Sequence, residues 1–87
     1  MSAYYFWSPT CGPCKTIKGA VEDLKEEFST VDWVSVNTHD DAELLTKKFG
    51  VTAVPTIVVV GATGTVEKHS GTSMMGYYRI LKNATRQ

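Results

Sequence analysis

Apolar and polar residues follow one another along this chain in blocks whose spacing predicts secondary structure. An apolar and aromatic run over residues 3–7 and a valine-rich run over residues 31–37 each have the length of a strand. Between them, apolar residues recur at spacings of four, three and four. This spacing predicts an amphipathic helix over residues 11–28, whose buried side is formed by Ile17, Val21, Leu24 and Phe28.

The middle of the chain predicts a second helix followed by a buried strand. Asp40 is expected to be the N-cap of this helix, with Glu43 completing a capping box, and Gly50 is expected to end it. Residues 56–60 form a nearly continuous apolar run. A run of this kind favours a central strand that is buried on both faces.

The last third of the chain predicts a hairpin and a final helix. A glycine-containing turn joins residues 56–60 to a strand over 65–69, and strands joined this closely are antiparallel. Ser73 is expected to cap the last helix. The order β-α-β-α-β-β-α begins with a right-handed crossover between parallel strands. We therefore predict an α/β fold in one domain, residues 1–87, with a mixed four-stranded sheet flanked by helices.

Charge and hydropathy narrow the classes of partner. Nine basic residues balance nine acidic ones, whereas surfaces that bind nucleic acid or anionic membranes carry an excess of Lys and Arg. The longest apolar run, residues 56–60, is far shorter than the roughly 20 residues that cross a bilayer. The first residues lack the basic and apolar pattern of a signal peptide. We expect a monomer in the cytoplasm that binds neither nucleic acid nor membranes.

The two cysteines, Cys11 and Cys14, carry the chemistry that the sequence offers. Residues three apart on a helix lie on the same side, and a bridge over so short a loop is a poor structural staple. His39 and His69 have no ligand-like spacing to the cysteines, so we expect no metal site. At the start of a helix Cys11 is expected to be an exposed nucleophile with a pKa below the usual value of about 8.5. Cys14, one turn further in, is expected to be less exposed. Two inert core cysteines are the alternative to this redox pair.

Three segments resemble the thioredoxin family. The pattern Trp-x-x-x-Cys-Gly-Pro-Cys-Lys of its active site is matched by Trp7-Ser8-Pro9-Thr10-Cys11-Gly12-Pro13-Cys14-Lys15. Its second signature is similar to Gly50-Val51-Thr52-Ala53-Val54-Pro55-Thr56. Its hairpin turn and third loop are similar to Gly64-Thr65-Val66 and Gly71. The resemblance covers nearly the whole chain and implies a thioredoxin-like fold.

The resemblance assigns roles around the cysteines. It implies that Cys11 is the nucleophile and Cys14 the resolving thiol, with Gly12 and Pro13 as the intervening residues that set the redox poise. Lys15 completes the motif. In addition, it implies that Trp7 is the aromatic neighbour of the disulfide; simple core packing is the alternative for that residue.

The resemblance also implies a groove for an extended substrate. Pro55 would be a cis-proline facing the disulfide, and Val54 would offer its backbone to a substrate strand. Gly71 would line the same groove. A plain strand-initiating proline and a plain turn glycine are the alternatives for Pro55 and Gly71.

The chain departs from the family in four places. Full-length thioredoxins begin with an extra strand and helix before the segment that starts here at Ala3, so the chain resembles a minimal, N-terminally shortened thioredoxin. Tyr5 stands where the family usually has a buried aspartate, and Val36 where a lysine often accompanies it. Thr10 replaces a second aromatic residue.

The resemblance implies a thiol–disulfide oxidoreductase that reduces protein disulfides, in electron transport and cell redox homeostasis. It would use the redox-active Cys11–Cys14 disulfide, without a bound cofactor, and take electrons from a thioredoxin reductase. A glutathione-dependent, glutaredoxin-like reductase is an alternative, although glutaredoxins more often have Cys-Pro-Tyr-Cys and a Gly-Gly pair. A third alternative is a binding subunit with a thioredoxin fold and no redox chemistry.

Overall fold

The computed structural model describes residues 1–86 and has the predicted order of elements. These elements are β1 (Ser2–Trp7), α1 (Gly12–Glu27), β2 (Asp32–Asn37), α2 (Leu45–Lys48), β3 (Thr56–Val60), β4 (Val66–Ser70) and α3 (Met74–Thr85). The strands form one sheet in the order β2-β1-β3-β4. β1 is parallel to β2 and antiparallel to β3, and β3 is antiparallel to β4. The mixed four-stranded sheet is therefore confirmed.

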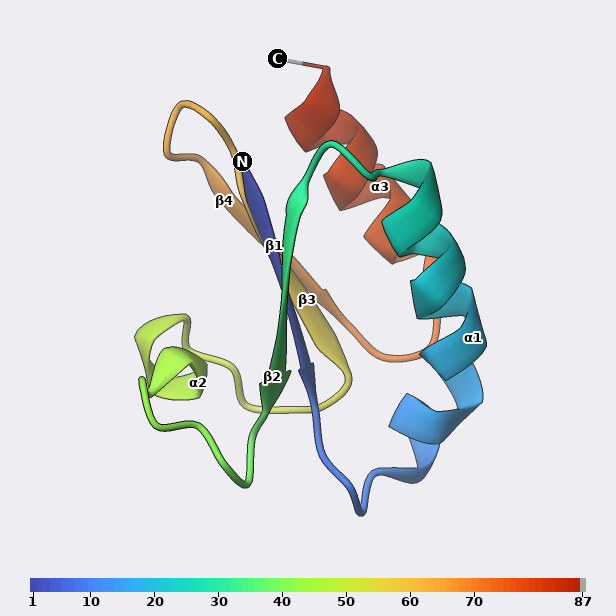
Figure 1. The fold of residues 1–87 in the computed structure, drawn as a ribbon, viewed down its shortest axis with the longest axis vertical. Coiled ribbons are helices and arrows are strands. Elements are labelled where there is room, and N and C mark those ends of the chain that lie inside the picture. Colours follow the sequence, from blue (N-terminus) through green and yellow to red (C-terminus); the bar gives the residue numbers. More distant parts are fainter. Residues whose placement is uncertain (87) are drawn as a thin grey trace.

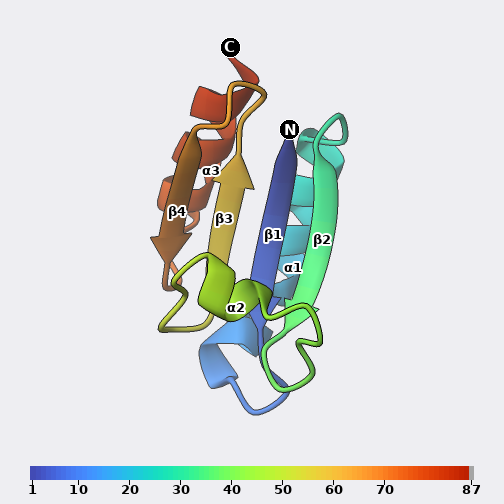
Figure 2. The same ribbon diagram turned by 90° about the vertical axis from the view of Figure 1, so that its left-hand side faces the viewer.

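Helices cover both faces of this sheet. Figure 1 shows α1 and α3 on one side of the strands and α2 on the other, and Figure 2 shows α2 in front of the sheet with α1 and α3 behind it. β3 lies inside the sheet, as predicted: Ile57 and Val59 pack toward α1 and α3, while Val58 packs toward α2. The alternation of side chains along a strand accounts for this division.

The first helix forms where the apolar spacing predicts it. Cys11 is its N-cap and Phe28 its C-cap, and Pro13 lies in the first turn, where its missing N–H leaves no hydrogen bond unmade. The predicted apolar side is buried against the sheet. Apolar burial on this face therefore places the start of the helix at the carboxyl end of β1.

The capping box predicted at Asp40 is wrong. Asp41 holds the second helix instead: its carboxylate accepts hydrogen bonds from the Leu45 and Thr46 amides at 3.0 and 2.8 Å and from the Thr46 hydroxyl at 2.6 Å. A turn closed by the Leu44 amide on the Asp41 carbonyl precedes the helix, and Leu44 has a left-handed φ of 55°. The helix therefore begins only at Leu45 and has four residues.

The ends of the other elements differ little from the prediction. β4 begins at Val66 and ends at Ser70, one residue later than expected, because the turn closes with the Gly61 amide on the Thr65 carbonyl at 2.8 Å. Ser73 is the N-cap residue of α3, but its hydroxyl makes no capping hydrogen bond. Gly50 follows α2 with a φ of 64°, as expected for a glycine that ends a helix.

Candidate functional site

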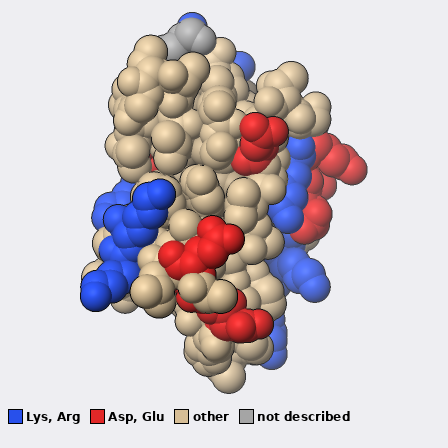
Figure 3. All heavy atoms as spheres, turned by 60° about the vertical axis from the view of Figure 1, so that its left-hand side comes forward, with Lys and Arg blue, Asp and Glu red and all other residues tan. Residues whose placement is uncertain are grey.

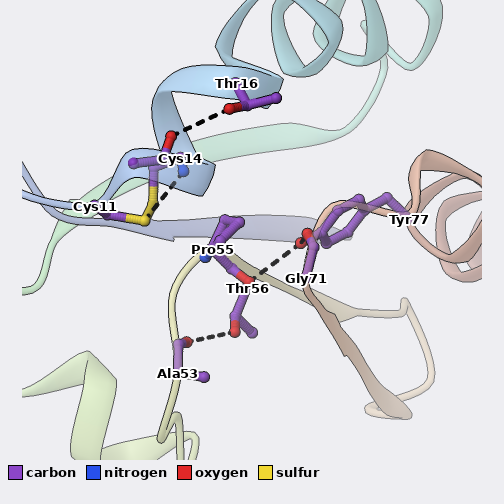
Figure 4. Close-up of a disulfide and its surroundings, with 9 residues drawn as sticks. Cys11, Cys14, Thr16, Ala53, Pro55, Thr56, Gly71 and Tyr77 are labelled. Carbon is purple, nitrogen blue, oxygen red and sulfur yellow. Dashed lines mark hydrogen bonds between the residues drawn. A yellow bond between two sulfur atoms is a disulfide. The ribbon is translucent and has the colours of Figure 1, made fainter.

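Cys11 and Cys14 form a disulfide at the junction between β1 and α1 (Figure 4). Their Cα atoms are 5.2 Å apart, within the ordinary range for a bridge. The Cys11 sulfur also accepts a hydrogen bond from the Cys14 amide at 3.1 Å, in the manner of an N-cap side chain. The Cys14 amide, which has no partner within the helix, and the positive end of the helix dipole are thus directed at the sulfur of Cys11.

Cys14 is less exposed than Cys11, as predicted, but the exposure of Cys11 itself differs from the prediction. Cys14 is 4% exposed, and Cys11, expected on the surface, is only 8% exposed. The hydrogen bond and the bridge both draw the Cys11 sulfur toward the helix, and this accounts for its burial. In the disulfide form the two sulfurs therefore differ in their position on the helix more than in their exposure.

The Val54–Pro55 peptide is cis, as predicted, and Pro55 lies within the surroundings of the disulfide drawn in Figure 4. The Gly71 amide donates to the Pro55 carbonyl at 3.0 Å, so the structure brings these two expected groove residues together. Gly71 has a φ of 101°, a conformation that L side chains rarely adopt. Within residues 1–86, neither backbone polar group of Val54 is engaged in a hydrogen bond.

The other motif residues lie around the start of α1. Trp7 is half-buried and packs against the core between the sheet and α1. Gly12, Pro13 and Lys15 are exposed. A cavity of about 270 Å³ reaches Cys14 from the side of β2, and its walls include Trp7 and Lys15 together with Tyr5, Lys18 and Glu22.

Tyr5 lines this cavity at the position where a buried aspartate was expected in the family. It is 6% exposed. Burial raises the pKa of Tyr5 above 10, and the nearby Glu22 carboxylate raises it further. The phenol is therefore protonated near neutral pH and is not a base for Cys14. Its neighbour on β2 is Ser35, whereas Val36, expected beside it, is paired with Phe6 and packs on the α2 face.

Tyr77 belongs to this region, although the sequence did not predict it as a site residue. Tyr77 of α3 was expected only within the last helix, yet its hydroxyl bonds to the Pro55 carbonyl at 3.1 Å and to the Gly71 carbonyl. The only available signal was a tyrosine on the apolar side of a helix, because a buried phenol usually finds a hydrogen-bond partner. Its partner could not be named without the fold.

The surface and the remaining side chains add three observations. In residues 1–86 no three of His, Cys, Asp and Glu gather closely enough to hold a metal ion. None of the helices that the structure describes has the length and apolar character to cross a membrane. On the face drawn in Figure 3, Lys and Arg occupy small groups separated by Asp and Glu, without one continuous patch of either sign.

The chain is similar to proteins named thioredoxin in sequence and in structure. A family model described as Thioredoxin matches residues 3–81. Thioredoxin of Haemophilus influenzae is 39% identical over 56 residues, which are 63% of this chain and 51% of that protein. Thioredoxin of Pyropia yezoensis is 34% identical over 58 residues, 66% of this chain and 53% of that protein. The chain thus spans about half the length of the curated relatives it matches.

Solved structures match over more of the chain. The thioredoxin of Fasciola hepatica superposes with a TM-score of 0.83 at 28% identity, covering 94% of this chain and 78% of that one. The thioredoxin of Trypanosoma brucei brucei gives a TM-score of 0.84 at 25% identity, with 99% and 75% covered. The thioredoxin-like fold expected from the sequence is confirmed.

Proposed function

The chain belongs to the thioredoxin family, and we propose on that premise that it is a thiol–disulfide oxidoreductase that reduces protein disulfides. The observation that carries the proposal is the Cys11–Cys14 disulfide at the start of α1, with the cis-proline Pro55 in its surroundings. We propose that residues 1–87 act as a single domain in this reaction, without a bound cofactor.

Cys11 is the nucleophile of the proposed reaction and Cys14 the resolving thiol. The hydrogen bond from the Cys14 amide to the Cys11 sulfur supports this order, because a thiolate accepts such a bond more strongly than a thiol does. The free amides and dipole at the helix start favour negative charge on the same sulfur. Cys14 lies one turn inside the helix, where these effects are weaker.

The proposed reaction moves two electrons in two exchange steps. The Cys11 thiolate attacks one sulfur of the substrate disulfide, the substrate S–S bond breaks, and the leaving thiolate takes up a proton. Cys14 then loses its proton and attacks the Cys11 sulfur, which releases the second substrate thiol. The products are two substrate thiols and the Cys11–Cys14 disulfide. A reductase returns the pair to the dithiol by supplying two electrons and two protons.

The substrate strand is proposed to pair with the backbone of Val54, beside Pro55 and Gly71. The free amide and carbonyl of Val54 support this assignment, because an extended peptide binds through such groups. We assign Trp7 as the aromatic neighbour of the disulfide. Gly12, Pro13 and Lys15, all exposed, complete the rim that a partner protein contacts.

The electron donor of the proposed cycle is a thioredoxin reductase, and the chain acts as a monomer in the cytoplasm, in electron transport and redox homeostasis. Family membership supports a reductase as donor. The use of two cysteines, both in the active pair, supports a reducing compartment. One relative is an M-type, chloroplastic thioredoxin of Brassica napus, so a chloroplast is the competing location. Antibody detection in cell fractions separates the two.

Reduction of insulin disulfides tests the activity and its donor. We expect turnover with thioredoxin reductase and NADPH, and little with glutathione and glutathione reductase. Faster turnover with glutathione would replace the proposed donor by the glutaredoxin-like alternative. If both donors fail while dithiothreitol-reduced protein also leaves insulin intact, the proposed activity is wrong.

Single-cysteine variants test the two roles. Cys14→Ser is expected to accumulate a mixed disulfide with insulin through Cys11, whereas Cys11→Ser forms none. In the reduced wild-type chain, limiting iodoacetamide is expected to label Cys11 first, as measured by peptide mass mapping. First labelling of Cys14 would reverse the assignment. A double serine variant with full biological effect would instead favour a binding subunit.

A further inference from the structure

We propose that Tyr77 is a positioning residue of the substrate groove: its hydroxyl holds the Pro55 and Gly71 backbone segments in the arrangement that receives a protein disulfide. The inference rests on the proposed function and extends it to a residue of the last helix. Tyr77 is hydrogen-bonded to neither cysteine, so its role is separate from that of the thiols.

Three hydrogen bonds join the Tyr77 hydroxyl, the Pro55 carbonyl and the peptide groups of Gly71. The Tyr77 oxygen is 3.1 Å from the Pro55 carbonyl and also contacts the Gly71 carbonyl. The Gly71 amide donates to the same Pro55 carbonyl at 3.0 Å. Figure 4 shows the Tyr77 hydroxyl directed at Gly71, next to the segment of Pro55. The Tyr77 hydroxyl therefore links the Gly71 carbonyl to the Pro55 carbonyl, and the Pro55 carbonyl also accepts from the Gly71 amide.

The surroundings of the ring hold the phenol in place. Tyr77 is 0% exposed, and the His69 ring of β4 stands perpendicular to it with centroids 4.9 Å apart. Gly76 leaves the space that His69 occupies, because a Cβ at that position would overlap the imidazole. Burial raises the pKa of Tyr77 to about 12, with a smaller contribution from the nearby Tyr5. The hydroxyl is therefore a donor throughout the physiological pH range.

Loss of this one oxygen should affect substrate binding more than thiol chemistry. Within residues 1–86, loss of the hydroxyl leaves the Gly71 carbonyl without a side-chain partner, and Gly71 itself then keeps the bond from its amide to the Pro55 carbonyl. A groove that must become ordered when substrate binds costs affinity. The disulfide lies at the start of α1, and neither cysteine is hydrogen-bonded to the loop at Gly71.

The chain contains a matched control one residue further along α3. Tyr78 is 36% exposed, its ring packs on Phe28 at 5.6 Å, and its hydroxyl makes no hydrogen bond within residues 1–86. Tyr77→Phe and Tyr78→Phe therefore remove the same atom from the same helix. Only the first removes a contact with the groove.

The test is a single-turnover reaction of the pre-reduced chain with excess insulin, compared with its reaction with 5,5′-dithiobis(2-nitrobenzoate). For Tyr77→Phe we expect the insulin concentration at half-saturation to rise roughly two- to tenfold, the value of one hydrogen bond, with the limiting rate unchanged. The rate with the small disulfide and the reduction potential should match those of the wild type. Tyr78→Phe should behave as the wild type in every measurement.

Stability is controlled by Val31→Ala, which removes a buried core side chain beside the start of β1. Pro55 precedes Thr56, which pairs with Phe6 at the opposite end of β1, so this change lies away from the groove. An unchanged half-saturation for Tyr77→Phe, with a wild-type chain that reduces both disulfides, overturns the inference and leaves the proposed function intact. Equal slowing of Tyr77→Phe on both disulfides, or a similar rise for Val31→Ala, also overturns it. A wild-type chain that reduces neither disulfide overturns the proposed function and the inference with it.

Discussion

The face of the sheet that packs on α1 and α3 differs in its burial from the face that packs on α2. The first is continuous and joins two long helices to the strands; its largest fully buried side chains are Val21, Ile57, Tyr77 and Leu81. On the second, the buried hydrophobic cluster within the described part of the chain consists of Phe6, Val36 and Val58, covered by half-buried side chains such as Leu45 and Phe49. Apolar burial is the main source of stability, so the two faces are expected to resist unfolding unequally.

The α2 face depends on polar contacts where the other depends on packing. The Asp41 carboxylate holds the start of α2, and the Lys68 ammonium donates to the Phe49 and Gly50 carbonyls at 3.1 and 3.4 Å. Both α1, which carries Cys14, and Tyr77 of α3 belong to the face that packs on α1 and α3. The proposed site is therefore built on the more rigid side of the sheet, and the groove segment Val54–Pro55 joins that side to the weaker one.

Adjacent valines of β3 provide the largest test of this difference. Val58 and Val59 are 0% and 1% exposed and face opposite sides of the sheet. Val59→Ala is expected to lower the free energy of unfolding by about 2–3 kcal/mol, and Val58→Ala by about 1–2 kcal/mol. The loss is smaller for Val58→Ala because the half-buried side chains that cover Val58 can move into the cavity left by the substitution. Urea unfolding measures both. Equal losses would contradict the proposed difference between the faces.

Two helical glycines test how tightly the packed face is filled. A Cβ on Gly76 would overlap the His69 ring, so Gly76→Ala is expected to destabilise the fold by about 1–2 kcal/mol after the gain in helix propensity. Gly19 of α1 has nothing within 4 Å of such a Cβ, and Gly19→Ala should stabilise by roughly 0.5–1 kcal/mol. The thermal midpoint follows both changes. If His69→Ala fails to rescue Gly76→Ala, the overlap is not the cause.

The smallest expected effect concerns the hydrogen bonds of the Asp41 carboxylate to the start of α2. Hydrogen bonds from the Thr46 side chain and amide and from the Leu45 amide lower the pKa of Asp41 below its ordinary value of 3.8. Because the pKa of Asp41 is lower in the folded chain than in the unfolded chain, its ionisation stabilises the fold at any pH above the unfolded-state pKa. This stabilisation is lost as the pH falls through the folded-state pKa. Asp41→Asn should therefore flatten the loss of stability below about pH 4 and speed amide exchange in α2.

The neighbouring Asp40 is the control for this measurement. Its side chain makes no hydrogen bond within residues 1–86, so Asp40→Asn should leave both the acid profile and the exchange of α2 as in the wild type. The capping interpretation of the sequence would have predicted the reverse. An unchanged profile for Asp41→Asn would show that α2 is held by its apolar contacts alone.

The sequence by itself determined the order of the elements, the buried β3 strand and the start of α1 at a cysteine pair. Each of these depends on a local pattern: the spacing of apolar residues, a proline in a first turn, glycines at turns. The motifs around Trp7, Pro55 and Gly71 also indicated which segments meet near the disulfide, because they resemble a known family. The predicted ends were wrong by only one or two residues outside α2.

Only the tertiary structure decided which aspartate holds α2, how deeply Cys11 is buried, and where the Tyr77 hydroxyl finds its partner. Asp40 and Asp41 have equal capping propensity, and the turn that ends at Leu44 selects between them. Pro55 and Tyr77 are 22 positions apart in the sequence, and β3 and β4 lie between them. This hydrogen bond forms because α3 packs against the sheet next to the start of β3. Packing between segments that are distant in the sequence has no local pattern from which it could be predicted.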